Sequence, residues 1–216
     1  MHLAVRPSPT PSVGSPMKRG SWVPIRTLSA PHRAQIEEHL RSLVPIDRYL
    51  RFGHIATDAQ IANYVALLDF DRDEVFGIFN RRLQLIAMAH LANISVPGEN
   101  LDRAVAEFGV SVITPARGRG YGARLFDHAT LHARNRGVST LVIHALSENT
   151  PMLAIARRAG AIVHREGPEA QASLKLPPQT VATRVGELVE RQAAELDYQW
   201  KASSTRLGPS WTFGQR

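Results

Sequence analysis

The segment PARGRGYGARLF, residues 115–126, combines three glycines at alternate positions with three arginines. It follows the apolar stretch 110–113 and precedes a helical pattern, so it is predicted to connect a strand to a helix. Such a turn aims backbone N–H groups and the positive end of a helix dipole at one point. Glycines let the backbone approach an anion closely, and Arg117 and Arg119 add guanidinium groups suited to phosphate oxygens. The turn is therefore predicted to bind phosphate; the alternative is an ordinary tight turn.

Two common phosphate-binding turns match this segment less well. A P-loop requires Gly-Lys-Ser/Thr where the helix begins, and here Gly122 is followed by Ala123 and Arg124. Residues 118–123 do satisfy the loose dinucleotide pattern G-x-G-x-x-A, with Glu148 after the next strand as a ribose ligand. That pattern normally opens a doubly wound domain, however, and too few strands remain after Glu148 to build one.

A third kind of turn matches in both sequence and context. Residues 110–126, VSVITPARGRGYGARLF, resemble the signature of the GNAT N-acetyltransferase superfamily. In that family an Arg/Gln-x-x-Gly-x-Gly/Ala turn after the fourth strand binds the pyrophosphate of coenzyme A, and the matching residues here are Arg117, Gly120 and Gly122. Residues 148–161, ENTPMLAIARRAGA, resemble a second family segment in which an asparagine opens a helix. The two motifs occur in the family's order and spacing.

The resemblance extends over residues 22–176, and three segments within it indicate one group of proteins inside the superfamily. The segments RYLRFG (48–53), LLDFDRDEVFGIF (67–79) and AEFGVSV (106–112) are similar to the acetyltransferase domain of bacterial protein lysine acetyltransferases that modify acyl-CoA synthetases. The resemblance implies an α+β (mixed α/β) class and a GNAT-like fold. This fold has a central twisted mixed sheet of six to seven strands flanked by helices, to which the chain adds a C-terminal helix. It also implies acetyl-CoA as co-substrate.

By the same resemblance, the coenzyme site comprises the end of a strand, the turn and the asparagine. The residues expected to contact the coenzyme are Val110, Val112, Arg117, Gly118, Arg119, Gly120, Tyr121, Gly122 and Asn149. The strand around Val112 would hydrogen-bond the extended pantetheine arm, and a backbone N–H there would stabilise the carbonyl oxygen as negative charge develops on it. Asn149 is equally an ordinary residue for the start of a helix.

Acetyl transfer to an amine needs a neutral nitrogen, whereas a lysine amine, with a pKa of about 10.4, is protonated at pH 7. Glu107 lies on the strand before the turn, and AEF resembles the family strand whose glutamate acts as general base, directly or through water. Strand alternation places Glu107 on the same face as Ser111. The alternative for Glu107 is a solvated glutamate on an edge strand.

Two further expectations about the reaction follow from the resemblance. Many relatives carry a tyrosine that protonates the departing thiolate, and Ala156 stands at that position here. A coenzyme A thiolate can leave unaided because its pKa is close to that of cysteine, about 8.5. Arg48, Arg51 and Phe52 border the acceptor groove by resemblance, with helix packing and solvation as the alternative roles.

Other classes of site are excluded by what the sequence lacks. The chain has no cysteine, which excludes disulfides, thiolate metal sites and a cysteine nucleophile. The nine histidines show no HExxH spacing. His128 and His132 lie four residues apart without a third partner, so they are predicted to be surface histidines and no metal site is expected. No G-x-S-x-G nucleophile elbow is present.

The composition of the chain limits which ligands we expect it to bind and where in the cell we expect it to be. The formal net charge of +7 favours polyanions, but the arginines are scattered and aromatic residues make up only 6% of the chain. A small phosphate-bearing ligand is therefore expected rather than nucleic acid. The sequence has no uninterrupted apolar window of about 18 residues and no signal-peptide pattern. We expect a cytoplasmic protein that does not interact with membranes.

The elements that must position the site follow from hydrophobic periodicity. The predicted strands are 22–25, 74–79, 83–92, 104–113, 141–146, 161–164 and 172–176. Helices are predicted from Ser29, from an N-cap at Asp58, from Tyr121 to a stop at Gly137, from an N-cap at Thr150 to a stop at Gly160, and after Pro178.

Three regions are expected along the chain: a flexible Pro/Ser-rich arm (1–20), an acetyltransferase domain (21–177), and an amphipathic helix with a tail (178–216). The apolar side of this last helix carries Val181, Val185, Leu188, Val189, Gln192, Leu196 and Trp200. It either covers the protein's own sheet or pairs with a second subunit in a homodimer.

These observations predict an acetyl-CoA-dependent N-acetyltransferase. The acceptor is a primary amine, either a protein lysine or a small amine, which attacks directly with Glu107 as general base and without a covalent enzyme intermediate. The alternative is a module on the same fold that binds acyl-CoA or nucleic acid without catalysis.

Overall fold

The computed structural model describes residues 23–94, 104–178 and 181–206. In this part of the chain seven strands form one sheet in the order β1-β2-β3-β4-β5-β7-β6. They are β1 (Arg26–Leu28), β2 (Glu74–Phe79), β3 (Leu85–Asn93), β4 (Val105–Val112), β5 (Thr140–Leu146), β6 (Ile162–Glu166) and β7 (Glu169–Lys175). In this sheet only the pairing of β4 with β5 is parallel. The predicted mixed sheet is confirmed.

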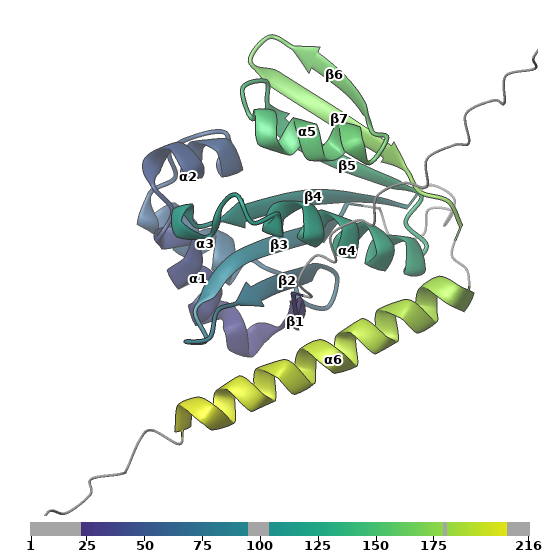
Figure 1. Cartoon of the computed structure of the whole chain (residues 1–216). Coiled ribbons are helices and arrows are strands. Elements are labelled where there is room, and N and C mark those ends of the chain that lie inside the picture. Colours follow the sequence, from purple (N-terminus) through teal and green to yellow (C-terminus); the bar gives the residue numbers. More distant parts are fainter. Residues whose placement is uncertain (1–22, 95–103, 179–180, 207–216) are drawn as a thin grey trace, which may run out of the picture.

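Helices cover both faces of the sheet (Figure 1). They are α1 (Arg33–Arg41), α2 (Pro45–Phe52), α3 (Asp58–Ala66), α4 (Tyr121–Asn135), α5 (Thr150–Arg158) and α6 (Val181–Arg206), with short 3-10 turns at Ala30–His32 and Thr114–Ala116. Helices α1 and α3 pack on one face, α4 and α5 pack on the other, and α6 runs beside the β1 edge. None of the helices in the described residues combines the length and hydrophobicity needed to cross a bilayer.

Strand alternation gives the sheet an apolar layer on each face. Val75 and Met88 are buried with Ile36 of α1 on one face. Phe108 is buried on the other face, where its ring meets the edge of Phe126 of α4 at a centroid distance of 5.1 Å. Each fully buried side chain of this size contributes about 1.5–3 kcal/mol, so the two layers hold the sheet rigidly.

The pairing of β4 with β5 ends before the strands do. Only Val105 to Glu107 of β4 pair with Thr140 to Val142 of β5, although β4 continues to Val112 and β5 continues to Leu146. Strand β5 instead pairs over its whole length with β7. Because β4 stays with β3 and β5 stays with β7, the sheet splits beyond Glu107. This split positions the candidate site.

Most predicted elements are confirmed, and the differences are local. The first strand is at Arg26–Leu28, and residues 23–25, the described part of the predicted strand 22–25, precede it without belonging to a strand. Thr57, not Asp58, caps α3, because its hydroxyl accepts the Gln60 N–H while the Gln60 side chain accepts the Thr57 N–H. Similarly, Asn149 and not Thr150 caps α5. Helix α2 was not predicted. The predicted arm, 1–20, lies outside the described residues.

Helix α6 docks through its polar side. The apolar residues Leu188, Val189, Leu196 and Trp200 are 56–72% exposed, whereas Ala194, on the opposite side of the helix, is 3% exposed. The predicted alternative in which the apolar side of α6 covers the protein's own sheet is therefore wrong for these residues. Pairing of that side with a second subunit stays a prediction.

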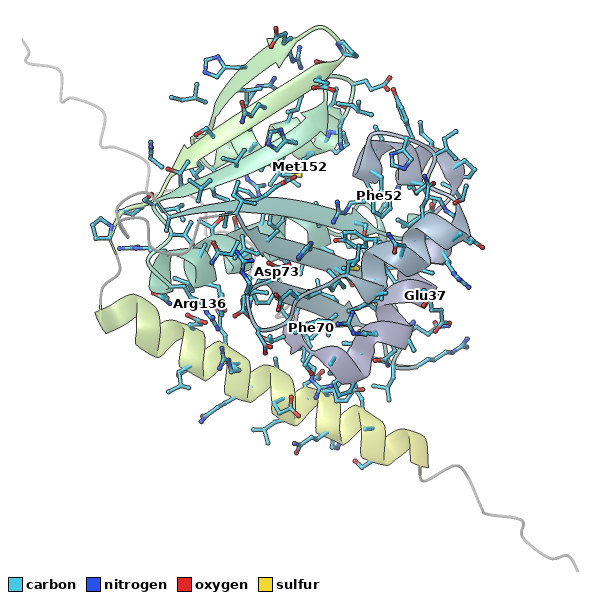
Figure 2. The ribbon with its side chains drawn as sticks, turned by 180° about the vertical axis from the view of Figure 1, so that it is seen from behind. Glu37, Phe52, Phe70, Asp73, Arg136 and Met152 are labelled. Carbon is cyan, nitrogen blue, oxygen red and sulfur yellow. The ribbon has the colours of Figure 1, made fainter. Side chains whose placement is uncertain are left out.

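Ion pairs explain this orientation. Arg26 of β1 donates two hydrogen bonds to the Glu195 carboxylate, at 3.0 and 3.2 Å, and its guanidinium lies 3.6 Å from the centroid of the Tyr198 ring. Glu74 of β2 pairs with Arg136, labelled near α6 in Figure 2, and also interacts electrostatically with Arg191 of α6. These charges lie at the edge of β1 and β2, so the polar side of α6 is the one that finds partners there.

The two α4 histidines are not at the surface, which corrects the prediction. His128 is 9% exposed and His132 is 2% exposed, and both rings meet Phe76 edge-on. His132 Nδ1 lies 2.5 Å from Glu187 Oε1 of α6. The reason is that α6 covers this part of α4 and supplies carboxylates to it. Among the described residues, no group of side chains is arranged to hold a metal ion.

A further buried histidine ties α1 to the sheet. His39 Nδ1 lies 2.9 Å from the Leu85 carbonyl oxygen, and Nε2 lies 2.8 Å from Ser111 Oγ. Because a carbonyl only accepts, Nδ1 carries the hydrogen and Nε2 accepts from the Ser111 hydroxyl. Burial lowers the pKa of His39 to about 4.

Because His39 is buried, we expect the free energy of unfolding to decrease at acidic pH. Below pH 6.5 the unfolded chain binds a proton at His39 and the folded chain does not, so stability falls as the pH drops to about 4. The expected loss is about 3 kcal/mol. The free energy of unfolding can be measured with urea at pH 7 and at pH 4. Between these two pH values it should fall by about 3 kcal/mol less in His39→Gln than in the wild type. In the exposed control His54→Gln it should fall as much as in the wild type. An equal drop in His39→Gln would contradict the assignment.

Candidate active site

The split between β4 and β5 opens a cleft of about 1020 Å³. Its walls are β4, the glycine turn, β5, the start of α5, and α2. Phe52 of α2 and Met152 of α5, both labelled in Figure 2, line opposite walls. A cleft of this size accepts a large, extended ligand.

The backbone of β4 faces this cleft at alternate residues. The Ile113 N–H donates to the Ile86 carbonyl, and the Val105 carbonyl accepts from Ile94, both at 3.1 Å. The odd-numbered residues of β4 therefore direct their main-chain groups to β3, and the even-numbered ones direct theirs toward β5. Because β5 has diverged, the N–H and C=O of Val110 point into the cleft. An extended chain of amides could hydrogen-bond there.

The glycine turn presents free backbone amides. Gly118 and Gly120 have left-handed φ values of 72° and 76°, which glycine adopts without strain. A Cβ at either residue would meet no atom within 4 Å. Among the described residues, the N–H groups of 118–123 have no hydrogen-bond acceptor; the Arg124 N–H is the first to find one, the Gly120 carbonyl. The start of α4 can thus bind an anion.

The two arginines of the turn have different surroundings. Arg117 forms an ion pair with Asp47 of α2, and its Nε donates to the Val112 carbonyl at 3.3 Å. Asp47 is 5% exposed and also accepts from Thr114 Oγ1 at 3.4 Å. Arg119 is exposed and does not line the cleft. Arg117 therefore fastens α2 to the turn, whereas the backbone amides of 118–123 remain free for an anion.

Helix α2 also joins the start of α5. Asn149 Oδ1 accepts the Met152 N–H at 3.3 Å, and its Nδ2 donates to the Leu50 carbonyl at 3.3 Å. The Tyr49 hydroxyl donates to Glu148, which raises the pKa of Tyr49. Glu148, the ribose ligand of the dinucleotide alternative, is thus engaged by α2. Helix α2 bridges the two walls of the cleft, a role that no sequence motif indicated.

Glu107 lies where the two strands part. It is the last β4 residue paired with β5, and its half-buried side chain lines the cleft. No other residue in the described part of the chain hydrogen-bonds or pairs with its carboxylate. The group is therefore free to accept a proton from a ligand in the cleft.

The structure brings most of the predicted site together. The cleft lining includes Glu107, Val110, Val112, Arg117, Gly118, Gly120, Tyr121, Gly122 and Asn149. Of the residues predicted to contact the coenzyme, only Arg119 lies outside it. Arg51 and Phe52, predicted to border the acceptor groove, also line the cleft, whereas Arg48 does not and instead donates to the carbonyls of Arg41 and Ala56. A strand, a turn, and a helix start that are separate in the sequence thus share one cavity.

Comparison with known proteins agrees with this geometry. A family model described as an acetyltransferase (GNAT) domain matches residues 25–162, more than half of the chain. The chain belongs to the GNAT acetyltransferase family. The mixed seven-stranded sheet with flanking helices is accordingly the GNAT fold, as the sequence resemblance implied.

Several solved structures share the fold at low sequence identity. The GNAT domain of S. lividans PAT is 18% identical with a TM-score of 0.59, and the match covers 70% of this chain and 89% of that one. The ribosomal-protein-alanine N-acetyltransferase from Brucella melitensis is 17% identical (TM-score 0.55, coverage 70% and 99%). A phosphinothricin acetyltransferase from Sinorhizobium meliloti, solved with AcCoA, is 15% identical (TM-score 0.57, coverage 74% and 91%).

The α5 position at which the resemblance implied a tyrosine in many relatives is an alanine in this chain. Ala156 of α5 is completely buried in the core between α5 and the sheet. Its methyl side chain offers no hydroxyl to a ligand in the cleft.

A polar cluster that the sequence did not reveal lies beside Glu107. Asp73 Oδ2 is 3.0 Å from His90 Nε2, His90 Nδ1 is 2.8 Å from the Tyr64 hydroxyl, and Arg51 Nη2 donates to that hydroxyl at 3.0 Å. Because Tyr64 accepts from Arg51, its proton goes to His90 Nδ1, and His90 Nε2 donates to Asp73. Burial lowers the pKa of His90 and raises that of Tyr64.

The members of this cluster come from four separate segments. They lie on α2, on α3, before β2 and on β3, where His90 pairs in register with Gly109 of β4. In the sequence, His90 is only a polar residue within an apolar strand. No spacing links it to Tyr64 or Asp73, so sequence reasoning had no signal to find the cluster.

Proposed function

We propose that this protein is an acetyl-CoA-dependent N-acetyltransferase with its active site in the cleft between β4 and β5. The observation that carries the proposal is the splitting of the one parallel strand pair next to a glycine turn with free amides. The split frees strand backbone for an extended arm, and the turn provides donors for a pyrophosphate. Both features line one cavity, and they follow each other along the chain in the order expected for the GNAT family.

The residues present fit acetyl-CoA. The amides of 118–123 and the space above Gly118 and Gly120 would hold the pyrophosphate, and the cleft-facing groups of Val110 and Val112 would pair with the pantetheine arm. From Val112 to Glu107 the strand spans roughly 17 Å, so the turn and the carboxylate would lie at opposite ends of an extended arm. When bound, acetyl-CoA supplies the activated acetyl group.

We assign general-base catalysis to Glu107. Its unpaired carboxylate would take the proton of the acceptor ammonium, directly or through water, and leave a neutral nitrogen. An N–H of β4 that faces the cleft would stabilise the oxyanion. Because Ala156 provides no acid, the thiolate would leave unaided.

We propose only the chemical class of the acceptor, a primary amine. Similarity of three sequence segments to bacterial protein lysine acetyltransferases supports a protein lysine. The solved relatives are named for different acceptors, a ribosomal-protein alanine in one and phosphinothricin in another. A small amine therefore has equal support from the fold.

The test is binding followed by turnover with the wild-type protein. We expect acetyl-CoA to bind in a calorimetric titration, and free thiol to appear only when an amine is added. The amine panel should contain a lysine peptide, simple amines and free amino acids. Binding without turnover across the panel would favour the non-catalytic alternative. No binding to the folded protein would overturn the proposal.

A further inference from the structure

An arginine without a carboxylate partner lines the cleft next to Glu107. The ion pairs of the described residues include none that involves Arg51, and its one hydrogen bond is to the neutral Tyr64 hydroxyl. Its Nε and Nη1 have no acceptor in this part of the chain. A half-buried guanidinium normally pairs with an anion, because desolvated charge is costly. Arg51 therefore has unused capacity to bind one.

The position of this guanidinium is closely defined. A Cβ on Gly109 would lie 2.7 Å from Arg51 Cζ and 2.7–2.8 Å from its two terminal nitrogens, so the guanidinium rests directly on the Gly109 backbone. The hydrogen bond from Nη2 to Tyr64, which in turn bonds to His90 and through it to Asp73, also holds the guanidinium in place. Tyr64 and His90 separate Asp73 from Arg51, so they orient the arginine without neutralising it by direct contact.

Arg51 and Glu107 form a complementary pair of charges at the acceptor end of the cleft. Gly109 and Glu107 are two residues apart on one face of β4, a separation of about 7 Å. Both Arg51 and Glu107 line the cleft, yet they form no ion pair within 4.0 Å of each other. A ligand with an ammonium and a carboxylate a few bonds apart could reach both groups at once.

We propose that Arg51 binds the carboxylate of the acceptor and so selects amines of the amino-acid type. The inference rests on the proposed function, because it assigns the substrate class of that site. The planar guanidinium would bind the carboxylate through its free N–H groups, while Glu107 receives the proton of the adjacent ammonium. A lysine side chain, with no carboxylate near its amine, would leave Arg51 unpaired. Arg51 is thus a specificity-determining residue.

The test compares each free amino acid with its own carboxamide. The two share the side chain and the amine and differ in the charge that Arg51 would bind. For the wild type we expect kcat/KM for the best amino acid to exceed that for its amide by at least about 10-fold. Arg51→Met should lower the amino-acid value by about 10–100-fold and change the amide value less than about 3-fold.

Two further variants separate charge from position. In Gly109→Ala the new methyl group would displace the guanidinium without removing it, so the preference for the amino acid should also fall. Arg158→Met makes the same chemical change on an exposed residue of α5 outside the cleft and should keep the preference. An unchanged acetyl-CoA dissociation constant would show that each variant is folded.

The outcomes distinguish this inference from the proposed function. If the amide is as good as the acid, or Arg51→Met lowers both equally, the inference is wrong and the acetyltransferase stands. If only a lysine peptide is acetylated, the inference about amino-acid acceptors is wrong, but the proposed N-acetyltransferase activity is supported. If acetyl-CoA does not bind, or no amine is acetylated, both proposals fail.

Discussion

Replacement of Gly120 by glutamate is expected to abolish acetyl-CoA binding while the protein stays folded. Gly120 caps α4 with a φ of 76°, and a side chain there would enter open space beside the free amides of 118–123. The carboxylate would repel the pyrophosphate and compete for the same N–H groups. We expect binding to weaken by at least about 100-fold, which is the loss of two charge-assisted hydrogen bonds.

The chain contains a matched control for this variant. Gly137 follows α4, has a similar φ of 81°, and has no atom within 4 Å of its would-be Cβ, but it does not line the cleft. Gly137→Glu thus carries the same new charge and a similar backbone strain, about 1 kcal/mol. Thermal unfolding should shift alike in both variants, whereas calorimetry should show lost binding only in Gly120→Glu. Unchanged binding in Gly120→Glu would place the pyrophosphate elsewhere.

Replacement of Glu107 by glutamine is expected to remove turnover and leave binding intact. The substitution keeps the size of the side chain but removes its basicity, and no described residue loses an ion-pair partner. We expect kcat to fall by about 10²–10⁴-fold, the usual contribution of general-base catalysis. The dissociation constant of acetyl-CoA should change less than about 2-fold, because Glu107 lies at the far end of β4 from the turn.

The pH profile makes this prediction specific. Without a base, only the acceptor molecules that are already neutral can react, so the residual rate of Glu107→Gln should rise about 10-fold per pH unit below the amine pKa. The control is Glu169→Gln, a change of the same kind in another carboxylate that lines the cleft. It should keep the wild-type rate and profile. A wild-type kcat in Glu107→Gln would show that the base is another group.

The local chemistry of the sequence was sufficient to predict the elements around the site. Alternation in β4, the glycines before α4 and the helix start at Asn149 are decided by residues within a few positions of each other. These features, together with the family resemblance, predicted the sheet and the residues that line the cleft. Helix α2 escaped prediction because it is only eight residues long and is held by distant partners, such as Arg117 on Asp47.

What the tertiary structure decided is which side chains meet across the sheet. The amphipathic pattern of α6 indicated an apolar docking side, but Arg26 of β1 and His132 of α4 pair with Glu195 and Glu187 on its polar side instead. Likewise, the Arg51 guanidinium lies directly against the backbone of Gly109, which is far from it in the sequence. Periodicity and turn chemistry act over a few residues, whereas strand register and the split of the sheet bring distant residues together. The sequence by itself therefore determined the fold and the glycine turn, and only the folded chain determined that the Arg51 guanidinium lies in the cleft beside Glu107.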